Sequence, residues 1–201
     1  MKNKYAVLKN GGIYNFKSHS SKNYVNTLIT LLKLSGNRNS SNFSFISNVD
    51  SAKYEDTSVQ DYILCEHTLD FFDQDIKNLF KNKDCMHLYD LISNKIEKID
   101  KLKYHTQENL FLFSLVKALL HCPNRTLFME IAPHSINEFT LKRVMNILDY
   151  EARTKKRLII IAANSGIFRN DFFDGVIIKD SHGKYSIDPM QTEINATKYV
   201  A

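Results

Sequence analysis

Residues 125–137, RTLFMEIAPHSIN, decide how the rest of the chain is interpreted. The apolar run at 127–129 has the length of a strand buried on both faces, and it is too short for a helix. Glu130 ends the run, and open α/β sheets place ligand-binding groups at the carboxyl ends of their strands. We expect Ile131 to face the same crevice, at the place for a general base, although its side chain cannot take a proton. The stretch therefore predicts a strand end suited to a ligand, where Glu130 is acidic and Ile131 is apolar.

The composition indicates one globular domain. With 201 residues, 43% of them hydrophobic, the chain can build one good hydrophobic core. The net charge of +5 permits acidic partners, but the lysines are scattered, so no nucleic acid partner is indicated. We expect a cytoplasmic protein, because the sequence has neither a signal-peptide core nor an apolar segment of membrane-spanning length. The widely spaced Cys65, Cys85 and Cys122 are typical of reduced thiols.

The order of the predicted elements is that of an α/β protein. A turn at Gly11 and Gly12 separates two short strands, and a polar loop then leads into an amphipathic helix at 25–32. Residues 58–104 have a helical pattern, broken near 81–84, that we interpret as a small helical insertion. The other predicted elements are strands at 5–9, 13–16, 43–46, 127–130, 158–163, 173–179 and 184–187, and helices at 107–121 and 139–154.

Four segments carry a resemblance to a known family. They are FKSHSSKN at 16–23, HTQEN at 105–109, the strand that ends in Glu130, and the strand that ends in Asn164. In this order they resemble the nucleotide-binding domain of an ABC transporter, in register over about 12–187. The resemblance implies an α/β fold of P-loop NTPase type, in which helices flank a mostly parallel sheet.

The resemblance also implies the domain organisation. It implies a single ABC ATPase-like domain over 1–201, with the helical insertion at about 58–104 and a frayed tail at about 190–201. The N-terminal β part looks truncated, because only about fifteen residues precede the phosphate-loop segment. Tyr5 lies too close to that segment to serve as the aromatic residue that stacks on adenine in the family.

The phosphate-loop motif G-x-x-x-x-G-K-[ST] falls on FKSHSSKN. Lys22 matches the lysine, but Phe16, His19 and Ser21 stand at the glycine places, and Asn23 replaces the magnesium-binding hydroxyl. Glycines are needed there because the backbone N–H groups must curl around phosphate in conformations that a side chain resists. Phosphate contact by Lys22 and plain solvation of this lysine both remain open.

Two further motif positions are altered. Asn48 stands where the resemblance places the glutamine of the Q-loop, and it is shorter by one methylene. HTQEN stands at the LSGGQ signature, with Gln107 and Glu108 at its two glycines. An acid at a helix start that faces a polyphosphate is electrostatically unfavourable. The segment is better explained as a plain helix start that Thr106 caps.

The two strand ends carry the remaining motif positions. The resemblance implies that Glu130 stands for the magnesium-side aspartate, Ile131 for the catalytic glutamate and Asn164 for the switch histidine. The segment at 135–137 then stands for the loop that crosses the dimer interface. Because losing a general base typically costs about 10²- to 10⁴-fold in rate, no catalytic residue is assigned with confidence.

Two cysteine–histidine pairs invite a zinc interpretation. Cys65 with His67, and Cys85 with His87, form two C-x-H pairs that could offer sulfur and nitrogen ligands. Both pairs fall in segments with a helical pattern, where residues two apart point in different directions. We predict no metal site from them.

We interpret the chain as a degenerate ABC transporter ATP-binding subunit, a pseudo-ATPase that works by binding and not by hydrolysis. The resemblance implies that it acts as a regulatory or structural partner of an ATPase/permease complex at the inner face of the membrane. Its implied partners are a membrane permease subunit, a second ATP-binding subunit, or a second copy of itself in a dimer. This interpretation requires no cofactor.

Two alternatives stay open. The chain could be a divergent but active ATP-hydrolysing subunit of an ABC exporter, with ATP and Mg²⁺ bound by Lys22, Asn23, Asn48 and Glu130 and with Asn164 as a further site residue. It could also be a stand-alone interaction or immunity protein on the same scaffold.

Overall fold

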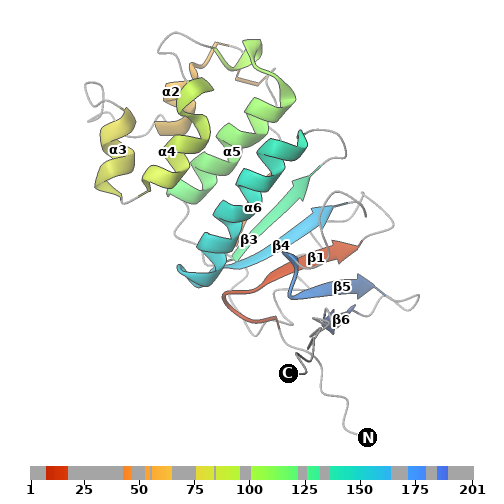
Figure 1. The fold of residues 1–201 in the computed structure, drawn as a ribbon. Helices are drawn as coiled ribbons and strands as arrows, with labels where there is room; N and C mark the ends of the chain where they lie inside the picture. The colour runs from red at the N-terminus through yellow and green to blue at the C-terminus, as the bar shows by residue number, and fades with distance from the viewer. Residues whose placement is uncertain are drawn as a thin grey trace, which may run out of the picture.

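A single six-stranded sheet with helices on one face forms the described part of the chain (Figure 1). The computed structural model describes residues 8–17, 43–46, 53–54, 56–64, 76–83, 85–95, 101–121, 126–131, 136–163, 172–179 and 185–189. Its strands are β1 (Ile13–Lys17), β2 (Phe43–Ile46), β3 (Thr126–Ile131), β4 (Leu158–Ala163), β5 (Gly175–Lys179) and β6 (Tyr185–Pro189). Its α-helices are α2 (Val59–Leu64), α3 (Ile76–Asn82), α4 (Met86–Ile92), α5 (Gln107–His121) and α6 (Glu138–Arg153), with short 3₁₀ turns η3 (Ser93–Lys95) and η4 (Leu102–Tyr104).

The strand order across the sheet is β2-β3-β4-β1-β5-β6. The first five strands run parallel, and β6 alone pairs antiparallel, with β5. The chain places β2, β3 and β4 on one side of β1 and then crosses to the other side for β5. A mostly parallel sheet flanked by helices is thus confirmed as the fold class, and the strand order reverses beside β1.

Both faces of the sheet are buried, as continuous apolar strands require. On the face that carries α5 and α6, alternate strand residues join a core with the helices, which we call the helix-side core; its strand members include Ile13, Leu127, Met129, Ile131, Ile159 and Ile161. Residues of the other parity form a second cluster, the opposite-side core, which includes Tyr14, Phe16, Phe128, Leu158, Ile160 and Ile177. The period of two along each strand divides the apolar residues between these two cores.

The helical insertion packs mainly against α5. Figure 1 shows α2 and α4 beside α5, with α3 beyond α4, and residues of α2, α4 and α5 share the helix-side core. Lys117 of α5 also holds its Nζ 4.0 Å from the ring centroid of Tyr62 in α2. No helix of the described residues is long and apolar enough to cross a membrane.

Several predicted elements are confirmed, and one predicted strand is wrong in the part that the structure describes. The strands at 43–46 and 158–163 and the helix at 107–121 have the predicted bounds. The predicted strand at 5–9 is not found where it can be seen, since Leu8 and Lys9 lie outside any strand. Gly12 N–H donates to the Lys9 carbonyl, and Gly11 has a φ of +83°, so a tight turn precedes β1. β1 pairs in parallel with β4 and β5 instead of forming a hairpin.

Candidate functional site

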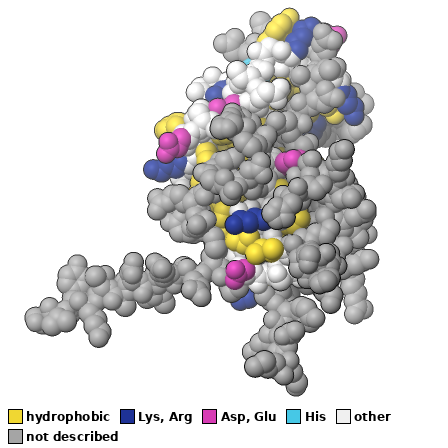
Figure 2. All heavy atoms as spheres, turned by 90° about the vertical axis from the view of Figure 1, so that its right-hand side faces the viewer, with side chains coloured by type: hydrophobic (Ala, Val, Ile, Leu, Met, Phe, Trp, Pro, Cys, Tyr) yellow, Lys and Arg dark blue, Asp and Glu magenta, His cyan; other side chains and the backbone are white. Residues whose placement is uncertain are grey.

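The carboxyl ends of the parallel strands meet at one edge of the sheet. β3 lies beside β4, and β4 beside β1, so the ends of these three strands are neighbours at the edge where the strand order reverses. Figure 2 is turned so that the side of the molecule toward which these strands run faces the viewer. Of the predicted site residues, Glu130 and Ile131 are described, whereas Lys22, Asn23, Asn48 and Asn164 lie outside the described residues.

Glu130 lies one residue before the end of β3. It pairs in register with Ala162 of β4, and its side chain is half-buried. Strand alternation places it on the face of Phe128, which belongs to the opposite-side core. The carboxylate therefore lies at the carboxyl edge, on the face away from α5 and α6.

Ile131 points to the other face of the sheet. Its side chain is 2% exposed and belongs to the helix-side core. The expectation that Ile131 faces the crevice beside Glu130 is wrong, because consecutive residues of a strand point to opposite faces and both residues lie within β3. The apolar side chain at this position contributes to packing under the helices.

The start of α5 is tied to the start of α6 by Glu108. Its carboxylate accepts hydrogen bonds from the backbone N–H of Asn137 (3.1 Å), from Asn137 Nδ2 (2.8 Å) and from the Thr140 hydroxyl (2.6 Å). Partial burial raises the pKa of Glu108, but the bonds from Thr140 and Asn137 outweigh it, so the pKa lies below its ordinary value. The predicted capped helix start is confirmed, since Thr106 Oγ1 accepts from Asn109 N–H at 3.3 Å.

Asn137 is committed within the chain as well. Its Oδ1 accepts from Thr140 N–H at 2.9 Å and so caps α6, while its Nδ2 donates to Glu108. The resemblance places this residue in a loop that crosses a dimer interface. In the structure, both polar atoms of its side chain contact neighbours in the same chain.

Comparisons with known proteins agree on one fold. No protein-family model matches the sequence, and neither does any curated protein. Among solved structures, the ATP-binding subunit of an ABC transporter is similar with a TM-score of 0.62 at 10% identity, over 86% of this chain and 76% of that one. An inward-facing metal-chelate type ABC transporter has a TM-score of 0.57 at 10% identity, over 91% and 75% of the two chains. This chain has the fold of an ABC-type ATP-binding cassette.

A third solved structure has the same cassette fold. A dimeric ATP-binding cassette in a post-hydrolysis state, bound to ADP and Pi, is similar with a TM-score of 0.55 at 10% identity, over 86% of this chain and 82% of that one. At these identities the likeness shows the cassette fold alone.

A buried charged cluster in the described part of the chain was not anticipated from the sequence. Glu151 of α6 is 0% exposed, and its carboxylate lies 2.9 Å from Lys155 Nζ, 3.1 Å from Arg157 Nε and 3.2 Å from His87 Nε2. Burial lowers the pKa of Lys155, but the contact with Glu151 outweighs it and leaves the pKa raised. The acid with a lysine four residues later was a helical pairing signal that could have pointed to part of this cluster.

The charged cluster also accounts for one of the two C-x-H pairs. His87 contacts Glu151, and Cys85 Sγ lies 3.6 Å from Lys155 Nζ. Cys65 and His67 lie outside the described residues. Within the described ranges no group of three or more His, Cys, Asp or Glu side chains could hold a metal ion.

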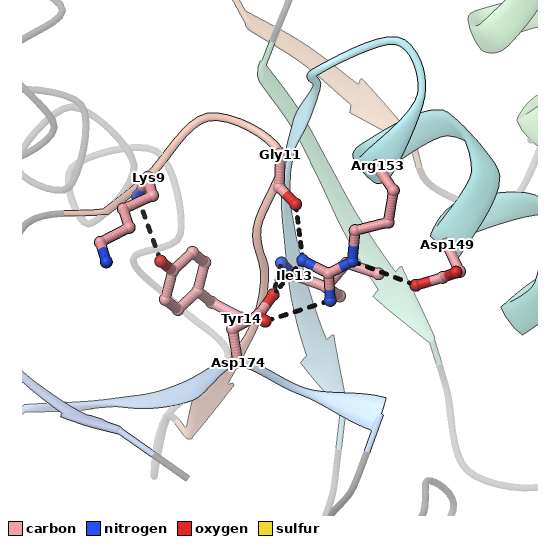
Figure 3. A network of polar contacts seen from close by, with 7 residues as sticks. All are labelled: Lys9, Gly11, Ile13, Tyr14, Asp149, Arg153 and Asp174. Atoms are coloured by element: carbon pink, nitrogen blue, oxygen red, sulfur yellow. Dashed lines mark hydrogen bonds and ion pairs between the residues drawn. The ribbon is translucent and has the colours of Figure 1, made fainter.

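A second polar network lies at the opposite, amino-terminal edge of the sheet (Figure 3). Arg153 at the end of α6 makes a bidentate contact with Asp174, at 2.9 and 3.1 Å, and donates to the Gly11 carbonyl at 2.7 Å. Asp174 also accepts from Ile13 N–H at 2.7 Å. The hydrogen bond with Asp174 raises the pKa of Arg153. This network joins α6, β1 and the start of β5 far from the candidate site, so we regard it as structural.

Proposed function

We propose that this chain is a degenerate ABC-type cassette that works by binding a partner protein and does not hydrolyse ATP. The observation that carries the proposal is the position of Ile131 in the helix-side core, directly after Glu130 at the end of β3. The residue that the resemblance aligns with the catalytic glutamate is apolar, and its side chain is buried in the helix-side core, on the face opposite to Glu130. Without a general base there, hydrolysis would lose about 10²- to 10⁴-fold in rate.

The start of α5 supports the same conclusion. In the cassettes that this chain resembles, the signature segment caps a phosphate bound by the opposing subunit. In this chain Glu108 places a carboxylate at that helix start, and its lowered pKa favours the charged form. A second negative charge from a polyphosphate would be repelled there.

The cassette fold also suggests the kind of partner. One of the similar solved structures is a dimer of cassettes, and another is an ABC transporter. By analogy, the partners of this chain are a membrane permease subunit, a competent cassette, or a second copy of the chain. The chain would then act at the inner face of a membrane as a structural or regulatory component.

Calorimetric titration with Mg-ATP, together with a phosphate-release assay, tests the loss of chemistry. We expect no turnover, and we expect Lys22→Ala to leave partner binding unchanged. Micromolar ATP binding accompanied by measurable turnover would contradict the proposal. Loss of turnover in Lys22→Ala would then support the alternative of an active, divergent subunit.

Co-purification from native membranes tests the partner class. We expect a permease or a second cassette to be recovered with the full chain. Recovery of neither one, together with a soluble partner of another kind, would favour the alternative of a stand-alone interaction or immunity protein.

A further inference from the structure

One carboxylate joins the starts of two helices that are separated along the chain. Glu108 lies in the first turn of α5, and the groups that donate to it, from Asn137 and Thr140, lie 29 and 32 residues later at the start of α6. The donor–acceptor distances lie between 2.6 and 3.1 Å. We call these three residues the Glu108 clamp.

The Glu108 clamp supplies negative charge and acceptors to a helix start, as a bound anion does at many helix starts. The first N–H groups of a helix lack partners within the helix, and the helix dipole favours negative charge near them. Phosphates and carboxylates commonly fill such places. Here the anion is part of the chain, so it is present at high effective concentration and needs no ligand.

Two backbone N–H groups at the α6 start, those of Asn137 and Thr140, have side-chain acceptors within the chain. Asn137 Oδ1 accepts from the Thr140 N–H, while Glu108 accepts from the Asn137 N–H and from two side-chain donors. Charge-assisted hydrogen bonds of this kind are about twice as strong as neutral ones. These hydrogen bonds therefore stabilise the contact between the two helix starts.

We propose that Glu108 locks the starts of α5 and α6 in one arrangement in the absence of nucleotide, so that this part of the surface is preset. This proposal deepens the proposed function. Its statement about nucleotide rests on that function.

Amide hydrogen exchange measured by NMR on the full chain tests the Glu108 clamp. In Glu108→Ala we expect the amide of Asn137 to exchange about 10- to 100-fold faster, because it loses a charged acceptor. Glu138→Ala is the matched control, since it removes an exposed acid from the first turn of the same helix, and we expect it to leave that amide unchanged. Equal exchange of the Asn137 amide in the wild type and in Glu108→Ala would overturn the proposal.

Asn137→Asp separates the Glu108 clamp from the ordinary cap of α6. Asp caps helices as well as Asn, so the Thr140 amide should stay protected. The new carboxylate faces Glu108 and cannot donate to it, so the amide of residue 137 should exchange faster. Loss of protection at Thr140 alone would show that the contact serves only as a cap and would overturn the lock.

The same exchange measurement with Mg-ATP added distinguishes failure of the Glu108 clamp from failure of the proposed function. We expect Mg-ATP to leave exchange at 106–110 and 137–140 in the wild type unchanged. Additional protection of these helix starts by Mg-ATP would overturn the preset arrangement. Measurable ATP turnover with unchanged exchange at both helix starts would instead overturn the proposed function and leave the Glu108 clamp standing.

Discussion

The role of a single residue in this chain depends on which face of its helix or strand it occupies. Ile131 and Glu130 are neighbours in β3, yet one packs under the helices and the other lies on the opposite face at the sheet edge. A substitution intended to restore chemistry at Ile131 would therefore act on the core first.

Ile131→Glu is predicted to destabilise the fold and to produce no ATP turnover. The new carboxylate would be buried without a partner, which should lower the free energy of unfolding by about 3 kcal/mol or more. Ile131→Val is the matched control and should cost about 0.5 to 1.5 kcal/mol. Urea denaturation with a phosphate-release assay checks both, and a stable, active Ile131→Glu variant would contradict our assignment of its face.

Lys156 gives a prediction about backbone conformation. It follows α6 and has a φ of +57°, where a side chain is strained. We expect Lys156→Gly to raise the free energy of unfolding by about 0.5 kcal/mol, since glycine adopts this conformation freely but gains entropy in the unfolded chain. Lys142→Gly, in the exposed interior of α6, should instead lower it by about 1 kcal/mol. Destabilisation by both substitutions in chemical denaturation would count against strain at Lys156.

At the scale of elements, α6 is the helix that joins the other parts of the fold. Glu108 of α5 binds its start, and the buried Glu151 near its end contacts His87 of α4 and two cations that follow the helix. Asn137 caps it. Polar contacts therefore hold both ends of α6, while its apolar face packs in the helix-side core.

Glu151→Ala is predicted to be strongly destabilising. Removing this carboxylate leaves Lys155 and Arg157 without their buried partner, and breaking such a cluster typically costs about 3 to 5 kcal/mol. Asp149→Ala on the same helix removes an exposed acid that contacts Arg153, and it should cost less than about 1 kcal/mol. Thermal and urea denaturation compare the two variants. A similar small effect in both would mean that the buried cluster adds nothing to stability.

The Glu108 clamp predicts a dependence of stability on pH. The pKa of Glu108 is lower in the folded chain than the ordinary value of 4.5. The carboxylate therefore adds stability that is fully present well above pH 4.5 and is lost as the pH falls through the folded-state pKa. In Glu108→Gln this part of the decline should disappear. If the free energy of unfolding fell equally with pH in the wild type and in Glu108→Gln across this acid range, the stabilising role of the Glu108 carboxylate would be contradicted.

At the scale of the whole molecule, the network of Arg153 and Asp174 joins β1 and the start of β5 to the end of α6. Asp174 precedes β5 and accepts from Ile13 of β1, while Arg153 comes from the end of α6. A double-mutant cycle with Arg153→Met and Asp174→Asn should give a coupling of about 1 kcal/mol, because the pair is bidentate but half-exposed. Denaturation at low and high salt checks it. Strict additivity of the two substitutions would mean that the pair is energetically silent.

The sequence alone determined most of the elements and the class of fold. The strand at 158–163 and the helix at 107–121 have the bounds that their apolar patterns predict. These patterns are local, because burial on both faces requires a continuous apolar run and burial on one helix face requires a period near 3.6. The order of these elements also carried the resemblance to ABC-type cassettes.

Only the tertiary structure decided which face each residue takes and which distant residues meet. The sequence pattern ended the strand at Glu130, so it did not show that Ile131 continues β3 and takes the opposite face. A turn between two short strands likewise did not show that β1 would pair with β4 and β5. The contacts of Glu108 with Asn137 and of Glu151 with His87 span 29 and 64 residues. Contacts of this range depend on how whole elements pack, because no local periodicity encodes a partner that another element supplies.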